Sequence, residues 1–165
     1  MSPSPHLHTP RLQLRPLRQT DQGFISSLLG DAQVRQFLGG AVDLQRRSAA
    51  VAAYFSGEEG ETAWLVQTGI GQLPLGLVHL SPHWDEPCLE LSYQFAPGAW
   101  GKGYAIEAVQ CVRDHVLQDR KQERVLAETQ AANTASCRLL QRLGMTELRR
   151  LQRFGAEQVI YTTAP

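Results

Sequence analysis

The stretch that decides the fold is Pro97-Gly98-Ala99-Trp100-Gly101-Lys102-Gly103-Tyr104-Ala105-Ile106-Glu107-Ala108. Residues 89–95 before it alternate apolar and polar side chains, as a half-buried strand does, and residues 105–117 after it have the apolar spacing of a helix. Glycines at such a junction let backbone N–H groups converge with no Cβ in the way. The helix start adds unpaired donors and the positive end of the helix dipole. The stretch therefore predicts a binding site for an anion.

Two common phosphate-binding motifs do not fit this stretch. A P-loop needs an upstream glycine and a Ser or Thr after Gly-Lys, whereas this chain has Phe95 and Ala96 upstream and Gly103 after Lys102. The dinucleotide fingerprint needs a third glycine where this chain has Ile106. The residues therefore argue against a nucleoside-triphosphatase loop and against a dinucleotide-binding loop.

The motif that remains resembles the pyrophosphate loop of the GCN5-related N-acetyltransferase (GNAT) superfamily. That loop reads Arg/Gln-x-x-Gly-x-Gly/Ala, and Trp100 stands here in place of the leading Arg or Gln, as in some members that acetylate ribosomal protein N-termini. The resemblance implies that acetyl-coenzyme A (acetyl-CoA) is the cosubstrate and that its pyrophosphate binds this loop. The implied cofactor-binding residues of the loop are Trp100, Gly101, Lys102, Gly103, Tyr104 and Ala105.

Two further motifs resemble the same superfamily. The run from Asn133 to Met145 is similar to its Asn-x-x-Ser helix followed by Leu-Gly-Phe, with Asn133 suited to cap the helix and Gly144 suited to a left-handed C-terminal position. The run Thr9–Leu17, with Asp21, is similar to the first strand and helix of ribosomal-alanine acetyltransferases. Together the three motifs resemble the branch of RimJ and RimL, which acetylate ribosomal protein N-termini.

Length and composition limit the alternatives. A chain of 165 residues is long enough for one domain with its own core, so we expect a single acetyltransferase domain over 1–165 with 1–10 as a loose N-terminal extension. The 16 basic and 16 acidic side chains balance, which removes the usual electrostatic support for nucleic-acid binding. No apolar run is long enough for a membrane span or a signal peptide, and we expect a cytoplasmic protein. The three cysteines have no metal-ligand spacing, and we expect no metal.

Periodicity along the chain predicts an α/β (α+β) protein with the GNAT fold. The expected architecture is a mixed, mainly antiparallel central sheet of about six to seven strands with helices on both faces. The expected strands are residues 11–15, 63–68, 75–80, 89–95, 124–129, 146–154 and 157–163. The expected helices are residues 20–29, 43–55, 105–117 and the segment after Asn133.

Acetyl transfer to an amine needs a base for the amine, a polarised thioester carbonyl and a stabilised leaving thiolate. Glu90 is the first candidate base, because it lies on the polar side of its strand and matches a Glu of ribosomal-alanine acetyltransferases. An ordinary solvent-facing Glu is an equally good interpretation. Glu107 is a weaker candidate, since its place in the first helical turn is already explained by the dipole.

The remaining roles come from the resemblance. A backbone N–H of Phe95 or Ala96 is expected to polarise the carbonyl, and Asn133 is expected to hydrogen-bond the pantetheine arm of the cofactor. Ser136 is the candidate proton donor to the leaving thiolate and a cofactor contact. Many superfamily members use a Tyr beyond this helix, and the residues following Met145 offer none.

These observations predict an acetyl-CoA-dependent N-acetyltransferase that transfers acetyl to a primary amine by direct attack in a ternary complex. The preferred acceptor is a protein N-terminus, with a small amine next, and the protein is expected to be a monomer or homodimer without nucleic-acid or membrane partners. The alternative is a non-catalytic acyl-CoA-binding sensor that keeps the anion site without the chemistry.

Overall fold

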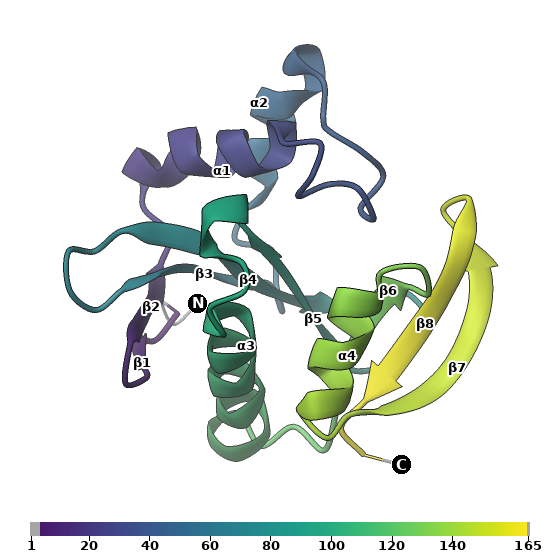
Figure 1. The fold of residues 1–165 in the computed structure, drawn as a ribbon. Coiled ribbons are helices and arrows are strands. Elements are labelled where there is room, and N and C mark those ends of the chain that lie inside the picture. The colour runs from purple at the N-terminus through teal and green to yellow at the C-terminus, as the bar shows by residue number, and fades with distance from the viewer. Residues whose placement is uncertain (1–3, 165) are drawn as a thin grey trace.

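The computed structural model describes residues 4–164, which form one eight-stranded sheet in the order β1-β2-β3-β4-β5-β6-β8-β7 (Figure 1). All neighbouring strands are antiparallel except β5 and β6, which are parallel. The strands are β1 (Leu7–His8), β2 (Leu12–Pro16), β3 (Thr62–Thr68), β4 (Pro74–Pro82), β5 (Leu89–Phe95), β6 (Val125–Gln130), β7 (Thr146–Arg153) and β8 (Ala156–Thr162). The α-helices are α1 (Gln22–Gly30), α2 (Leu44–Ala53), α3 (Tyr104–Asp114) and α4 (Thr134–Arg142).

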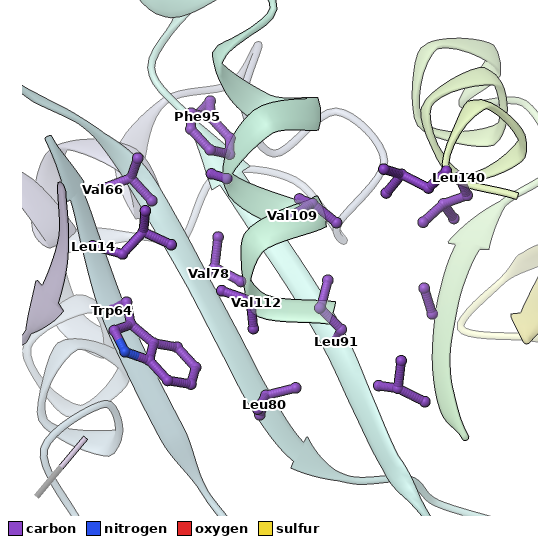
Figure 2. Close-up of a cluster of buried hydrophobic side chains, with 14 of the residues drawn as sticks. Leu14, Trp64, Val66, Val78, Leu80, Leu91, Phe95, Val109, Val112 and Leu140 are labelled. Atoms are coloured by element: carbon purple, nitrogen blue, oxygen red, sulfur yellow. The ribbon is translucent and has the colours of Figure 1, made fainter. Parts of the chain in front are cut away.

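Helices cover both faces of the sheet, as the sequence predicts. Side chains of successive strand residues point to opposite faces, so Trp64 of β3 joins a core with α3 while the adjacent Leu65 joins a core with α1 and α2. Figure 2 shows the first core, in which Val109 and Val112 of α3 lie over the strands. In the second, Leu65 packs with Ile25 of α1. The expected mixed, mainly antiparallel α/β architecture is therefore confirmed.

The sheet has one strand more than the sequence predicts. Leu7 and His8 form β1 and pair with Leu14 and Gln13 of β2, within the segment expected to be a loose extension. The indole Nε1 of Trp64 also donates a hydrogen bond to the Pro5 carbonyl over 2.8 Å. Two residues are too few to show an alternation, which is why periodicity missed this strand. Residues 1–3 of the expected extension lie outside the described residues.

The parallel pair β5 and β6 holds together only at its start. Leu89 pairs with Val125 and Glu90 with Leu126, and the remainder of β5 has no partner on that edge within residues 4–164. Figure 1 shows β5 and β6 running apart from this point, with α4 beside β6. The separation leaves residues 91–95 of β5 without a strand partner on this edge, in the middle of the sheet.

Both helices next to this separation begin as their sequences predict. Gly103 is the residue before α3, and the Asn133 side-chain oxygen accepts a hydrogen bond from the Ser136 N–H (3.2 Å) to cap α4. Gly144 after α4 is left-handed, with φ of 78°. No helix within residues 4–164 has the length and apolarity that crossing a bilayer requires.

Candidate active site

The glycine loop after β5 presents a row of unused backbone donors. Gly101 and Gly103 have φ of 73° and 77°, a left-handed conformation that favours glycine. The first helical hydrogen bond runs from the Glu107 N–H to the Gly103 carbonyl. The N–H groups of residues 101–106 have no acceptor among residues 4–164. The loop therefore combines free donors with the positive end of the α3 dipole, as an anion site requires.

Glu107 and Arg11 hold this loop against β2. The Arg11 guanidinium donates to the Glu107 carboxylate (2.7 Å) and to the Lys102 carbonyl (2.9 Å), and it lies 4.6 Å from the centre of the Tyr104 ring. Although burial opposes ionisation, hydrogen bonds from Thr9 and Arg11 lower the pKa of Glu107 below its ordinary value. Glu107 is thus a fixed carboxylate that fastens α3, which agrees with its structural interpretation.

A cavity of about 320 Å³ lies where β5 and β6 separate. It is lined by β5, β6, the start of α3, α4 and the segment 33–38 that follows α1. Five of the expected site residues line it, namely Phe95, Trp100, Ala105, Asn133 and Ser136. Glu90, Ala96 and the loop residues 101–104 do not line it, although Leu91 and Phe95 do.

The two backbone groups expected to polarise the thioester differ in their availability. The Ala96 N–H donates to the Leu75 carbonyl (2.9 Å), so it belongs to the ladder with β4. In an antiparallel ladder alternate residues bond to the partner strand, so Phe95, which faces Gly76, directs its N–H away from β4. That direction is the open edge of β5. Phe95 therefore has the free donor and Ala96 does not.

Trp100 stabilises the end of the same strand. Its indole Nε1 donates to the Phe95 carbonyl over 2.9 Å, and about half of the side chain stays exposed. Since the Phe95 carbonyl and N–H belong to adjacent peptide groups, this bond fixes the backbone next to the free donor. Lys102, by contrast, is exposed and donates through Nζ to the Gly98 carbonyl (2.9 Å).

Ser136 shares a hydrogen bond with a residue that sequence reasoning did not select. The hydroxyl oxygens of Ser136 and Tyr93 lie 2.6 Å apart, and both residues line the cavity. Burial raises the pKa of Tyr93 to about 12, although the bond to Ser136 opposes that shift, so the phenol is protonated at neutral pH. The alternation places Tyr93 on the apolar side of β5, where a core residue is expected. The pair supplies a neutral proton donor beside the open strand edge.

Glu90 lies in a buried acidic cluster on the opposite face of β5. Its carboxylate, that of Glu128 on β6 and the His83 imidazole bring ligand atoms within 4.8 Å of one another. Burial and, after it, the charge of Glu128 raise the pKa of Glu90 to about 7, and Arg153 opposes the shift. Arg153 donates to both oxygens of Glu128. Glu90 is therefore a carboxylate that titrates near neutrality, and Glu128 is the charge that sequence reasoning missed.

His83 completes this cluster with a buried ring nitrogen that faces Glu128. Its side chain is fully buried, and its Nδ1 accepts a hydrogen bond from the Asp85 N–H (3.1 Å). The neutral ring must then carry its hydrogen on Nε2, which lies 3.4 Å from a Glu128 oxygen without forming a hydrogen bond to any residue among 4–164. A metal ligand would need the Nε2 lone pair, so this tautomer suits hydrogen bonding to the carboxylates.

Comparison with known proteins agrees with this geometry. The family model described as "Acetyltransferase (GNAT) domain" matches residues 11–146. The fold and the amide loop thus define an acetyltransferase, and the chain belongs to the GNAT acetyltransferase family. GNAT enzymes use acetyl-CoA as the cosubstrate.

Similar proteins match nearly the whole chain. The uncharacterized N-acetyltransferase YnaD of Bacillus subtilis is 24% identical over 140 residues, which are 85% of this chain and 82% of YnaD. An acetyltransferase from Agrobacterium tumefaciens has a TM-score of 0.84 at 23% identity, covering 100% of this chain and 97% of that one. Spermidine N-acetyltransferase from Vibrio cholerae, solved with CoA and spermine, has a TM-score of 0.78 at 19% identity, covering 93% and 94%. These structures share the fold.

Proposed function

We propose that this acetyltransferase moves the acetyl group of acetyl-CoA directly to a primary amine in a ternary complex. The observation that carries the proposal is the open edge of β5. The free Phe95 N–H and the Tyr93–Ser136 pair lie along this strand, Glu90 lies where the strand parts from β6, and the amide loop follows its end. The resemblance to the RimJ and RimL branch favours a protein N-terminus as the acceptor.

The cofactor would bind by its two ends. The amides of residues 101–105 and the positive end of α3 suit the pyrophosphate, whose oxygens accept hydrogen bonds and carry negative charge. The pantetheine arm would lie along the open edge of β5, which lacks a strand partner. The amide groups of the arm can hydrogen-bond to this edge as a neighbouring strand would. The Asn133 side-chain oxygen caps α4, and its amide nitrogen has no acceptor among residues 4–164, so it is available to the arm.

The reaction then follows from the groups along β5 and at the start of α4. The ammonium form of the substrate loses a proton to the Glu90 carboxylate, and the lone pair of the resulting neutral amine attacks the thioester carbon, whose oxygen takes up negative charge near the Phe95 N–H. The C–N bond forms and the C–S bond breaks as this intermediate collapses. The sulfur leaves with the electron pair of the C–S bond and receives a proton from the Tyr93–Ser136 pair. The nitrogen releases its remaining extra proton to solvent, from which the pair regains one, and the products are the amide and free CoA thiol.

The pKa of Glu90 fits this role. A base works best when its pKa lies near the working pH, and burial together with Glu128 raises the pKa of Glu90 to about 7. Since the base acts as the carboxylate, turnover is expected to fall as the pH drops through this value. A solvent-facing Glu would lose activity only at much lower pH.

A small amine is the second candidate acceptor. The similar spermidine N-acetyltransferase acts on such an amine, according to its name. The segment 33–38 also lines the cavity beside β5, whose volume is about 320 Å³. A compact acceptor suits such a volume.

The first experiment is a thermal melt with and without acetyl-CoA, followed by an amine screen that detects free thiol. At a hundredfold excess over Kd, linkage predicts about 2.7 kcal/mol, or roughly 5–10 °C in Tm for a domain of this size. Turnover should fall about a hundredfold or more in Glu90→Gln, whereas Glu147→Gln, which removes an exposed carboxylate, should keep it. Binding of acetyl-CoA without thiol release from any amine would instead identify a sensor.

A further inference from the structure

A second cavity, of about 390 Å³, lies on the sheet face that carries α1 and α2. Its walls are the end of α2, the loop from α2 to β3, and β4. The aromatic residues Tyr54 and Phe55, the carboxylate of Glu61 and the imidazole of His79 line it together with Ser4, Pro16, Leu17, Gly57, Thr62 and Ala63. The acetyl-transfer reaction proposed above uses none of these residues.

The cavity carries an uncompensated negative charge. The Glu61 carboxylate lies 3.7 Å from His79 Nε2. Burial lowers the pKa of His79 below its ordinary value, although Glu61 opposes the shift, so the imidazole is neutral at neutral pH. Glu58 and Glu59 of the same loop are exposed and add negative potential. The Glu61 charge therefore has no cation to balance it inside the cavity.

The lining itself contains no Lys or Arg side chain, although two arginines contact lining residues from outside it. Arg15 touches the Pro16 carbonyl, but its guanidinium is paired with Asp21 at 2.8 Å. Arg120 reaches the Thr62 hydroxyl at 3.5 Å. The aromatic walls and the Glu61 carboxylate together suit a positively charged ligand.

The aromatic rings favour an ammonium group in particular. The Tyr54 ring meets the His79 ring edge to face, with centres 5.5 Å apart. Aromatic side chains stabilise organic cations through the ring quadrupole, by about 0.5–2 kcal/mol, and a nearby carboxylate adds a charge-assisted hydrogen bond. An alkylammonium group satisfies both kinds of contact, whereas an anion or an apolar group satisfies neither.

This cavity shares a wall with the transfer cavity. The Tyr54 hydroxyl accepts a hydrogen bond from Gln94 Nε2 (3.0 Å), and His79 pairs with Ser92 in the ladder of β4 and β5. Gln94 and Ser92 both line the transfer cavity. Glu90 follows on the same face, two residues before Ser92. A molecule that spans this wall can therefore place one end at Glu90 and the other at Glu61.

We propose that the acceptor is a small amine with a second positively charged group, and that Tyr54, Glu61 and His79 form the subsite for that second group. The proposal rests on the proposed function with its second candidate acceptor, the small amine, and it assumes that the reacting amine lies near Glu90. In this arrangement the subsite binds one ammonium group and thereby orients the other toward the thioester, which lowers KM for a diamine relative to a monoamine.

The test compares two probes and two variants. Putrescine and n-butylamine have carbon chains of equal length, and only putrescine has a second ammonium group. Glu61→Gln removes the subsite charge and keeps the side-chain shape. Glu59→Gln removes an exposed carboxylate of the same loop that does not line the cavity. We expect KM for putrescine to rise about tenfold in Glu61→Gln, with Glu59→Gln and all values for n-butylamine unchanged.

Equal KM values for the two probes in the unmodified enzyme would overturn the subsite, as would equal effects of the two substitutions. Better turnover of a peptide N-terminus than of putrescine, unaffected by Glu61→Gln, would also overturn it. If no amine causes thiol release, the proposed function fails. Calorimetric titration of the protein with putrescine then tests the subsite independently of acetyl transfer. Binding that is lost in Glu61→Gln supports it, and absence of binding to the unmodified protein overturns it.

Discussion

The two halves of the candidate site are built in different ways. The cofactor half uses backbone groups that are close in sequence, namely the amides of residues 101–106 and the Phe95 N–H. The acceptor half uses side chains from separate elements, with Glu90 on β5, Glu128 on β6 and Arg153 on β7. A backbone site depends on conformation and therefore on glycines, whereas a side-chain site depends on which strands the fold makes adjacent.

The largest effect, a loss of acetyl-CoA binding caused by a change in the cofactor half alone, is expected at Gly103. Gly103→Asp puts a carboxylate beside the proposed pyrophosphate, at the residue with φ of 77° that directly precedes α3. Two like charges about 4 Å apart near a protein surface repel by about 4 kcal/mol, so Kd for acetyl-CoA should rise more than a hundredfold. Calorimetric titration measures this change.

Gly103→Asn is the matched control for this substitution. Asn has nearly the same shape as Asp and tolerates a left-handed backbone, but it carries no charge. It should weaken binding far less than Gly103→Asp does. Equal binding by the two variants would place the phosphates elsewhere and would remove the contrast between a backbone half and a side-chain half.

The difference between the halves also explains what the sequence could predict of the fold. Seven of the eight strands have period-2 alternation or clear apolar runs, and the structure confirms them near their expected bounds. The helix expected to reach residue 117 ends at Asp114 and continues as a π-helical turn over His115–Asp119. Val112 and Val116 are both buried, so the apolar spacing continues across the change from α-helix to π-helical turn. Spacing alone therefore cannot locate the end of the α-helix.

The same limit applies to the candidate site. The glycines after β5 could be recognised because their spacing within one loop is itself the motif. Glu128 could not, because its importance comes from lying beside Glu90 on the neighbouring strand, 38 residues later in the chain. Tyr93 was missed because an aromatic residue on the apolar side of a strand is usually core. His83 is a lone histidine until the fold buries it against Glu128.

A smaller effect tests the boundary between the halves, where Tyr93 and Ser136 share a hydrogen bond. Tyr93→Phe and Ser136→Ala should each lower kcat about tenfold with little change in Kd for acetyl-CoA, because a thiol with a pKa near 8.5 leaves with modest help. If the hydroxyls act as one donor, the double variant should be no slower than either single one. Steady-state kinetics measures kcat, and titration measures Kd.

Tyr161→Phe is the control for this pair. Tyr161 is a buried tyrosine whose hydroxyl lies 3.4 Å from Gln141 Nε2, and it does not line the transfer cavity. Its loss should leave kcat unchanged. A larger effect at Tyr161 than at Tyr93 would assign the proton donor to Tyr161 instead.

The smallest expected effect is a shift of the pH profile by Glu128→Gln, which acts on the acceptor half alone. Glu128 is a negative charge that raises the pKa of Glu90, so its removal lowers that pKa. Turnover, which is lost as pH falls through the pKa of the base, should then persist to lower pH. Burial, the larger cause of the shift, is unchanged, so the pKa should stay above its ordinary value. The acid limb of the pH profile of kcat/KM measures this shift. Glu86→Gln is the control and should leave the acid limb where it is. An acid limb unaffected by Glu128→Gln would mean that another group is the base.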